Sequence, residues 1–327
     1  MPDGNPKQSF PVLNRAYNSV FRPGRLSVGL VVPLEAHGVN PVPTLHRHVE
    51  RAQLADRLGY ASLWLRDVPF NVPSFGDAGQ TYDPFVYLGF LSSVTQNIAL
   101  GVASVILPLR HPAHVAKAAA SADQLCGGRL LLGVASGDRP EEYPALNQNF
   151  QERGARFRDS LAYIRAAAED GPNYSGAYGS LTGSIDMLPK PTAGRIPVLI
   201  TGGSQQSPDW VAAHGDGWIT YPRNGAAQSR VVDDYRARAA QAGEPYKPVM
   251  QSLYVDVVSD SDADPRPIHL GFQSGTTFLR SYLRDLQAKG INHVALNLRF
   301  NGNDVEDTIE RLADSLLPEF HAKGPIT

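Results

Sequence analysis

Short apolar runs alternate along the chain with longer segments that carry helical periodicity or a helix start signal. Eight of these runs have the length and composition of buried strands: 26–32, 60–65, 98–107, 129–136, 196–201, 217–220, 248–258 and 292–298. Each run is followed by a helical segment. Because a parallel strand needs a crossover of helix size to reach its neighbour, the alternation predicts eight parallel βαβ units.

Eight such units favour a closed (β/α)8 TIM barrel. The alternative is an open doubly wound sheet, which is disfavoured because no G-x-G-x-x-G sequence follows the first strand. Proline or a capping residue indicates several helix starts, at Thr44, Pro84 and Pro112. The predicted helices cover 44–58, 84–95, 112–126, 155–169, 207–214, 226–242, 275–289 and 303–319.

The chain has 327 residues, which we interpret as one catalytic barrel domain, 26–327, behind an N-terminal arm, 1–25. The arm is polar and interrupted by prolines, so we expect it to lie loosely on the barrel or on a partner subunit. Segments rich in Gly, Pro, Tyr and Ser predict insertions near 67–83, 170–195 and 259–275, and the second should hold short hairpin strands.

Charge and cysteine content exclude several classes of protein. The formal net charge is −2 and no run of lysine and arginine stands out, which argues against nucleic-acid binding. Cys126 is the single cysteine, so the sequence offers no disulfide and no Cys/His spacing typical of a metal site. No apolar stretch reaches the roughly 20 residues of a membrane helix. These features favour a reducing, cytoplasmic location.

In a barrel of this kind the loops after the strands build the site. After the fifth apolar run, the sequence Thr201-Gly-Gly-Ser-Gln-Gln-Ser207 leads into a helix. Glycines allow close approach of the backbone to a ligand, and free N–H groups at a helix start attract anions. Gly202, Gly203, Ser204 and Ser207 therefore form a candidate phosphate-binding loop. The alternative is an ordinary turn capped by serine, and no Walker lysine is present.

Three residues after the first two apolar runs are candidates for catalysis. Arg66 and Asp67 follow the second run directly, and His37 follows the first. The arginine and the aspartate could instead form a salt bridge at the strand end, and the histidine could be a solvated loop residue. After the fourth run, Ser136 and Arg139 are further candidates.

Four stretches in this order resemble the luciferase-like flavin-dependent oxidoreductases: LGYASLWLRDVP, IALGVASVILPLRHP, DQLCGGRLLLGVASGDRPEEY and IPVLITGGSQQSPDWVAAHGDGWITYPR. The resemblance covers about 26–320. It implies a TIM barrel that binds FMN, or alternatively deazaflavin F420. The flavin phosphate would be held at Gly203, Ser204 and Ser207, beside Ala135 and Ser136. A non-proline cis peptide would lie behind the flavin ring, at Ala103–Ser104 or Ser104–Val105.

The sequence departs from the family at the end of the second strand. Many relatives carry a Glu-His-His-like sequence there, whereas this chain has Arg66-Asp67-Val68-Pro69. The histidine's role therefore cannot be transferred, and the chemistry should rely on Arg66, Asp67, His37 or Arg299.

The resemblance favours a monooxygenase that uses reduced FMN and O2 on a small organic substrate. The alternatives are an F420-dependent dehydrogenase, a non-catalytic flavin-binding protein, and an unrelated barrel lyase or isomerase. The resemblance also implies a homodimer formed through the helices after strands two and three. Because no NAD(P)H-binding motif is visible, a separate flavin reductase is a possible partner.

Overall fold

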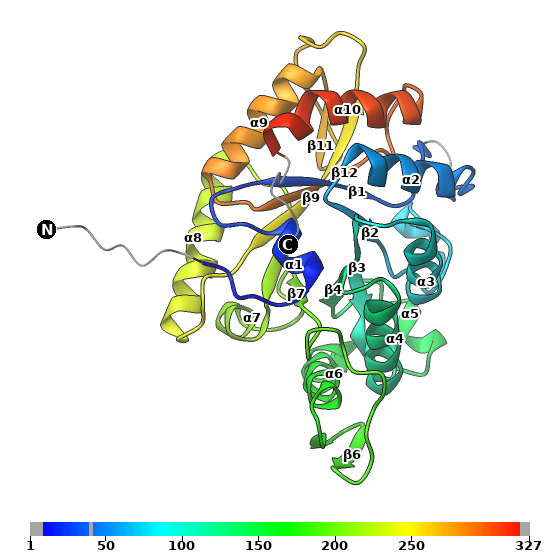
Figure 1. Ribbon diagram of the computed structural model, residues 1–327, viewed down its shortest axis with the longest axis vertical. Coiled ribbons are helices and arrows are strands. Elements are labelled where there is room, and N and C mark those ends of the chain that lie inside the picture. The colour runs from blue at the N-terminus through cyan, green and yellow to red at the C-terminus, as the bar shows by residue number, and fades with distance from the viewer. Residues whose placement is uncertain (1–8, 39–41, 321–327) are drawn as a thin grey trace, which may run out of the picture.

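The computed structural model describes residues 9–38 and 42–320 and contains a closed barrel of eight parallel strands (Figure 1). The strands are β1 (Ser27–Val31), β2 (Ser62–Leu65), β3 (Ala99–Ile106), β4 (Leu130–Ala135), β7 (Val198–Thr201), β8 (Gly217–Thr220), β9 (Val249–Val257) and β12 (His293–Asn297). Neighbours pair in that order, and β12 pairs with β1 to close the ring. All eight predicted strands are confirmed, and closure excludes the open sheet.

Eight helices cover the outside of the barrel (Figure 1). They are α2 (His48–Leu58), α3 (Pro84–Val94), α4 (Pro112–Leu125), α6 (Arg153–Ala168), α7 (Pro208–His214), α8 (Gly225–Gln241), α9 (Thr276–Ala288) and α10 (Val305–Phe320). Each overlaps a predicted helix. No helix within 9–38 and 42–320 is long and apolar enough to cross a membrane.

The predicted start of α2 at Thr44 is wrong. The Thr44 hydroxyl and backbone N–H both donate to the Glu35 carboxylate, at 2.9 and 3.0 Å, so they fix the preceding loop. The backbone then takes left-handed conformations at Leu45 and Arg47, and regular helix begins only at His48. Thr44, which the sequence indicated as the helix cap, thus bonds to Glu35 in the preceding loop instead, and the helix begins later.

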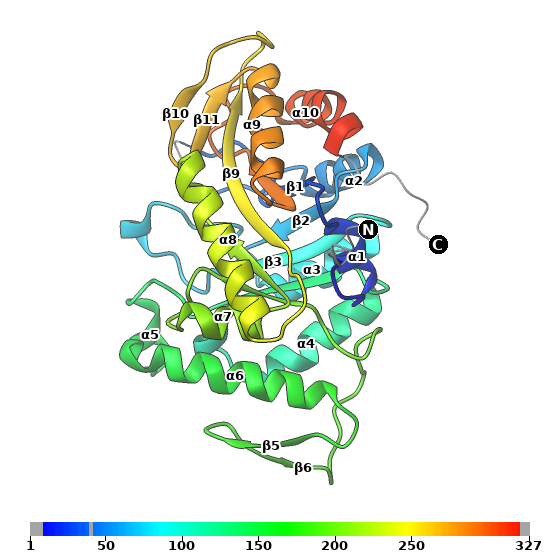
Figure 2. The ribbon, with the colours of Figure 1, turned by 90° about the vertical axis from the view of Figure 1, so that its left-hand side faces the viewer.

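Shorter elements occupy the three predicted insertions. The 3-10 turn η1 (Pro73–Phe75) lies after β2, and the hairpin of β5 (Asn173–Gly176) and β6 (Gly179–Thr182) lies after α6. Strands β10 (Arg266–Ile268) and β11 (Gly271–Ser274) extend the sheet beside the C-terminal part of β9 (Figure 2). The remaining elements are α5 (Glu142–Ala145) and the 3-10 turns η2 (Leu107–Leu109) and η3 (Phe150–Glu152).

The N-terminal segment closes one end of the barrel, so residues 9–25 lie on the barrel as expected but are packed against it rather than loose. Helix α1 (Arg15–Val20) lies over the centre of the ring in Figure 1. Tyr17, Val20 and Phe21 are buried in one apolar cluster with barrel residues such as Trp64. The Tyr17 hydroxyl also donates to the Asp216 carbonyl at 2.8 Å. Burial of these aromatic side chains fixes the segment, which its local polar composition does not reveal.

A hydrogen-bonded histidine links this end to the interior. Trp64 Nε1 donates to His293 Nε2 at 2.9 Å, so His293 Nδ1 carries the proton and faces Ser27 Oγ at 2.7 Å. Ser27 Oγ in turn donates to the Val20 carbonyl of α1 at 2.7 Å. Burial lowers the pKa of His293 to about 3, which keeps the ring neutral.

Candidate active site

A cavity of about 440 Å³ opens at the C-terminal ends of the barrel strands. In Figure 2 this end lies on the side of α5, opposite α1. Its wall combines the ends of β2, β3, β4 and β7 with Tyr221, Tyr254 and Asn297 from the remaining strands. The lining includes eight of the ten residues predicted for the site, all except His37 and Ser207: Arg66, Asp67, Ser104, Ala135, Ser136, Gly202, Gly203 and Ser204.

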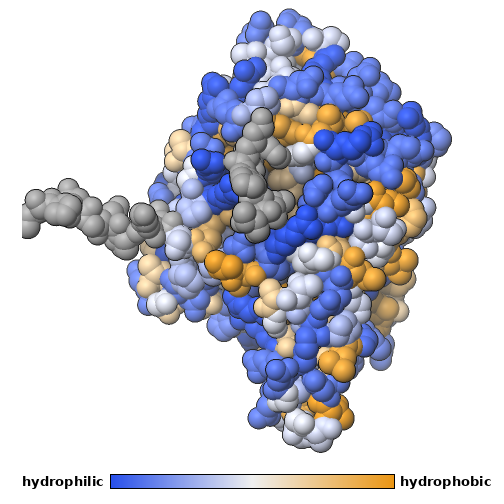
Figure 3. Space-filling view, viewed as in Figure 1, coloured by the Kyte–Doolittle hydropathy of each residue, from blue (hydrophilic) through white to orange (hydrophobic). Residues whose placement is uncertain are grey.

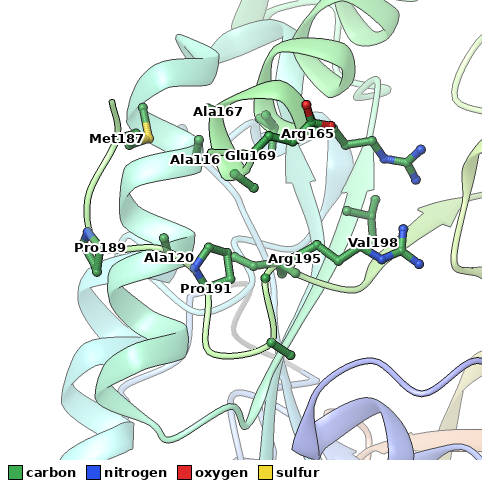
Figure 4. Close-up of a pocket in the computed structure, with 15 residues that line it drawn as sticks. Ala116, Ala120, Arg165, Ala167, Glu169, Met187, Pro189, Pro191, Arg195 and Val198 are labelled. Atoms are coloured by element: carbon green, nitrogen blue, oxygen red, sulfur yellow. The ribbon is translucent and has the colours of Figure 1, made fainter. Parts of the chain in front are cut away.

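A second cavity, of about 460 Å³, lies outside the barrel between α4, α6 and the segment 187–198 (Figure 4). Its two arginines already have protein partners: Arg165 donates to the His214 carbonyl, and Arg195 pairs with Asp216 at 2.8 Å. It borders the start of β7 rather than the end of a strand. Barrel enzymes place their chemistry at the other end, so we assign the candidate site to the first cavity.

The loop after β7 presents free backbone donors to the cavity. Gly202, Ser204 and Gln205 have positive φ angles of 55°, 44° and 60°. Within the part of the chain that the structure describes, the backbone N–H groups of Gly203, Ser204 and Gln205 have no acceptor. Consecutive unpaired N–H groups on such a backbone form an anion-binding nest. The donors are backbone atoms, so Gln205 belongs to the nest although the sequence prediction did not include it.

The two serines of this loop have local partners. Ser204 Oγ donates to the Thr201 carbonyl at 2.8 Å, which stabilises the turn. Ser207 Oγ accepts from Trp210 N at 3.2 Å and caps α7, and Ser207 does not line the cavity. The capped turn that was the alternative interpretation is therefore present at Ser207, next to the nest rather than in place of it.

The wall between β3 and β4 contains the irregular backbone that the resemblance implies. The Ala103–Ser104 peptide bond is cis, at the first of the two predicted positions, and the pairing with β4 shifts register between Val102 and Val105. The Ser104 hydroxyl is hydrogen-bonded to that of Thr201, and the Tyr143 hydroxyl donates to the Ser136 carbonyl. These contacts connect the ends of β3, β4 and β7 around the nest.

Arg66 and Asp67 do not pair with each other. The Asp67 carboxylate accepts from Arg110 Nε and Nη2 at 2.9 and 2.7 Å, and from Ile106 N at 3.0 Å. Its side chain is almost fully buried. Asp67 therefore forms a salt bridge at the strand end, which was the alternative to a catalytic role, but its partner is Arg110 and not Arg66.

Asp77 gathers the other charged candidates at the rim of the cavity. Its Oδ2 lies 2.5 Å from Arg66 Nη1 and 3.1 Å from Arg299 Nη1, and its Oδ1 lies 3.7 Å from His37 Nε2. Burial alone would raise the pKa of Asp77, but His37 and the Arg66 charge hold it well below its usual range.

His37 is buried behind Asp77 and does not line the cavity, and its Nδ1 lies 3.1 Å from the Glu35 carbonyl. It is therefore not a solvated loop histidine. Sequence reasoning gave Asp77 no role, because the acidic residue lies 10 positions after Asp67 in a loop without periodicity. Only the folding of that loop over the strand ends brings it to Arg66.

Arg139, after β4, lies on the same rim and is 4% exposed. Its Nη2 donates to the Asp77 carbonyl at 3.2 Å, and its guanidinium lies 4.5 Å from the centroid of the Phe75 ring. Nη1 has no hydrogen-bond partner among the described residues, and its nearest ion-pair oxygen, Glu142 Oε1, is 4.0 Å away. Burial and the Arg66 charge lower the pKa of Arg139, and burial raises that of Glu142. Arg139 is therefore a buried cation with an incomplete set of partners.

A closed parallel barrel with a cavity at the C-terminal strand ends has the architecture of α/β-barrel enzymes, whose active sites lie at this end. The family model described as luciferase-like monooxygenase matches residues 24–322. The chain belongs to this family of luciferase-like oxidoreductases, as the resemblance predicted.

Two mycobacterial proteins are similar to this chain in sequence, and a solved structure is similar to it in fold. An uncharacterised protein of Mycobacterium tuberculosis is 30% identical over 262 residues, which are 74% of this chain and 88% of that protein. An F420-dependent hydroxymycolic acid dehydrogenase of the same species is 30% identical over 201 residues, 60% of this chain and 52% of its own length. The oxygenating component of 3,6-diketocamphane monooxygenase from Pseudomonas putida, solved with FMN, shares the fold with a TM-score of 0.70 at 15% identity, covering 93% of this chain and 100% of that one. Relatives thus include both FMN and F420 proteins.

Proposed function

We propose that this protein is an FMN-dependent monooxygenase that uses O2 to oxygenate a small organic substrate. The nest at Gly203, Ser204 and Gln205 carries the proposal, because three N–H groups without a protein acceptor fit the phosphate of a flavin nucleotide. The resemblance assigns the phosphate to this same loop. FMN would supply the redox chemistry, as cofactors do in such enzymes.

The chain's own residues would hold the cofactor and exclude water. Ala103, Ser104, Ala135 and Ser136 line the wall beside the nest, where the flat flavin ring would lie against backbone. Trp64 lines the interior of the same cavity and is fully buried. The apolar inner part of this wall, which includes Val31, Trp64 and Met250, suits chemistry that water would interrupt. The donor Arg66 lies on the rim and could position a reacting oxygen atom by hydrogen bonding.

Cofactor identity is tested by titrating the purified protein with FMN, riboflavin and F420 and following the change in fluorescence. We expect FMN to bind at least about tenfold more tightly than riboflavin, which lacks the phosphate, because hydrogen bonds to a charged group contribute about 1.5–3 kcal/mol. Equal affinity for FMN and riboflavin would remove the assigned role of the nest.

Tighter binding of F420 than FMN would favour the second candidate, an F420-dependent dehydrogenase, which the mycobacterial relative supports. If FMN binds, consumption of O2 by the reduced enzyme without release of an equivalent amount of hydrogen peroxide would support oxygenation. Binding without any turnover would instead indicate a flavin-binding protein. If the protein is an oxygenase, a separate reductase would be the source of its reduced FMN.

We also propose that the chain forms a homodimer through α3. Val86 and Phe90 on this helix are 73% and 44% exposed. In Figure 3 apolar side chains gather on the side of the molecule that α2 and α3 occupy. The alanines of α4, by contrast, are mostly core, since Ala116, Ala119 and Ala120 are buried. Light scattering should give twice the chain mass for the native protein and the single-chain mass for Val86→Glu with Phe90→Glu. A native monomer would refute this interface.

A further inference from the structure

We propose that Arg139 and Arg66 form an anion-binding subsite at the mouth of the cavity, which receives a carboxylate group of the substrate. As a statement about the substrate, this rests on the proposed function. As a statement about binding, it depends only on the charges and contacts at the rim. The likeness to known proteins assigns no ligand to these two residues.

The arginines at the rim differ in how completely they are paired. Asp77 is shared between Arg66 and Arg299, and Asp67 is neutralised by Arg110, which also pairs with Asp83 at 2.7 Å. Arg139 is left with Glu142 at 4.0 Å, beyond hydrogen-bond distance. The exposed Asp138 also lines the cavity but forms no hydrogen bond or ion pair with Arg139, so Arg139 Nη1 has no close anionic partner among the described residues. A buried cation in this state gains from an added anionic partner.

The two arginines are held in place before any ligand arrives. Arg66 Nη1 contacts Asp77, and its backbone N–H donates to Gln80 Oε1 at 2.8 Å. Arg139 is fixed by its contact with the Phe75 ring and by its hydrogen bond to the Asp77 carbonyl. Both line the cavity, whereas Arg299 does not. Their donors therefore bind an anion with little further loss of conformational entropy.

This subsite is separate from the nest. Arg66 follows β2 and the nest follows β7, and β3 and β4 lie between them. Three strand spacings amount to about 14 Å along the sheet, which places Arg66 away from the nest. Arg139 follows β4, the neighbour of β7, so the competition experiment below tests whether its anion site is distinct from the nest. Guanidinium groups match the planar fork of a carboxylate. Tyr221, Tyr254 and Leu270 complete the wall, which suits a ligand with an apolar body and one carboxylate.

The test is isothermal titration of the protein, with and without FMN, using two carboxylates and their uncharged amides: benzoate with benzamide, and hexanoate with hexanamide. We expect at least one carboxylate to bind about tenfold more tightly than its amide. Arg139→Gln and Arg66→Gln should each weaken that binding about tenfold. Arg223→Gln is the matched control, because Arg223 follows β8 and donates to Thr220 Oγ1 at 2.6 Å outside the cavity lining, and it should leave the affinity unchanged.

If neither carboxylate binds more tightly than its amide in the native protein, the subsite is overturned, and this comparison needs no variant. Competition between the carboxylate and FMN for one site would also overturn it, because the arginines would then hold the cofactor's phosphate. Carboxylate binding that depends on both arginines in a protein without flavin affinity would support the subsite and refute only the proposed function. Circular dichroism of each variant confirms that it is folded, and Arg139→Lys, which keeps the charge, should retain more of the carboxylate affinity than Arg139→Gln.

Discussion

At the N-terminal end of the barrel the buried polar groups around His293 are paired, whereas several buried polar groups at the C-terminal end are not. At the N-terminal end, His293 has partners on both ring nitrogens, and Ser27 links it to α1. At the mouth, Arg139 Nη1, His37 Nε2 and the Glu142 carboxylate oxygens are buried without a hydrogen-bond partner among the described residues. Unpaired buried groups cost free energy.

The difference indicates what each end is for. Paired polar groups at the closed end add specificity to a packed core, since they are satisfied in only one arrangement. At the open end Arg139 lines the cavity, as do the residues of the nest of free N–H groups after β7, so both lie where a ligand would bind. Substitutions at the closed end should therefore affect stability, and those at the open end should affect binding.

The largest expected effect concerns His293 and pH. Its pKa is about 3 when folded and about 6.5 when unfolded, so the unfolded chain alone binds a proton between these values. Stability should therefore fall as the pH drops below 6.5, by about 2 kcal/mol between pH 7 and pH 5. Urea unfolding at both pH values measures the loss. In His293→Gln the loss should be smaller by this amount, because all other titrating groups are unchanged.

The same loss in the native chain and in His293→Gln would mean that the folded protein protonates this histidine. The closed end would then be more open to water than its burial indicates, and the contrast between the two ends would weaken.

A smaller effect comes from a matched pair of serines, one at each end. Ser27→Ala should destabilise the protein by about 1–2 kcal/mol, because Val20 O and His293 Nδ1 lose their partner in a dry environment. Ser104→Ala should cost less than about 0.5 kcal/mol, since the Thr201 hydroxyl at the cavity wall can turn to water. FMN affinity should fall only in Ser104→Ala. Chemical denaturation and flavin titration of both variants provide the comparison.

Equal destabilisation by the two substitutions would show that the Ser104–Thr201 contact is as much a part of the folded core as the closed end. A loss of FMN affinity in Ser27→Ala, with the fold intact, would show that the two ends are coupled through Trp64.

The sequence determined the barrel, because apolar runs at strand spacing and helix start signals such as Pro84 and Pro112 are local properties of the chain. It also determined the loop after β7, where Gly202 and Gly203 mark a backbone that approaches a ligand. The family resemblance placed the cis bond at Ala103–Ser104 or Ser104–Val105, and the structure has it at the first. The partners of Arg66 and Asp67, the position of His37 behind Asp77 and the fixing of α1 by Tyr17 were decided only by the tertiary structure. Each depends on residues that are distant in sequence, and ion pairs and packing between such residues leave no periodic signal in the chain.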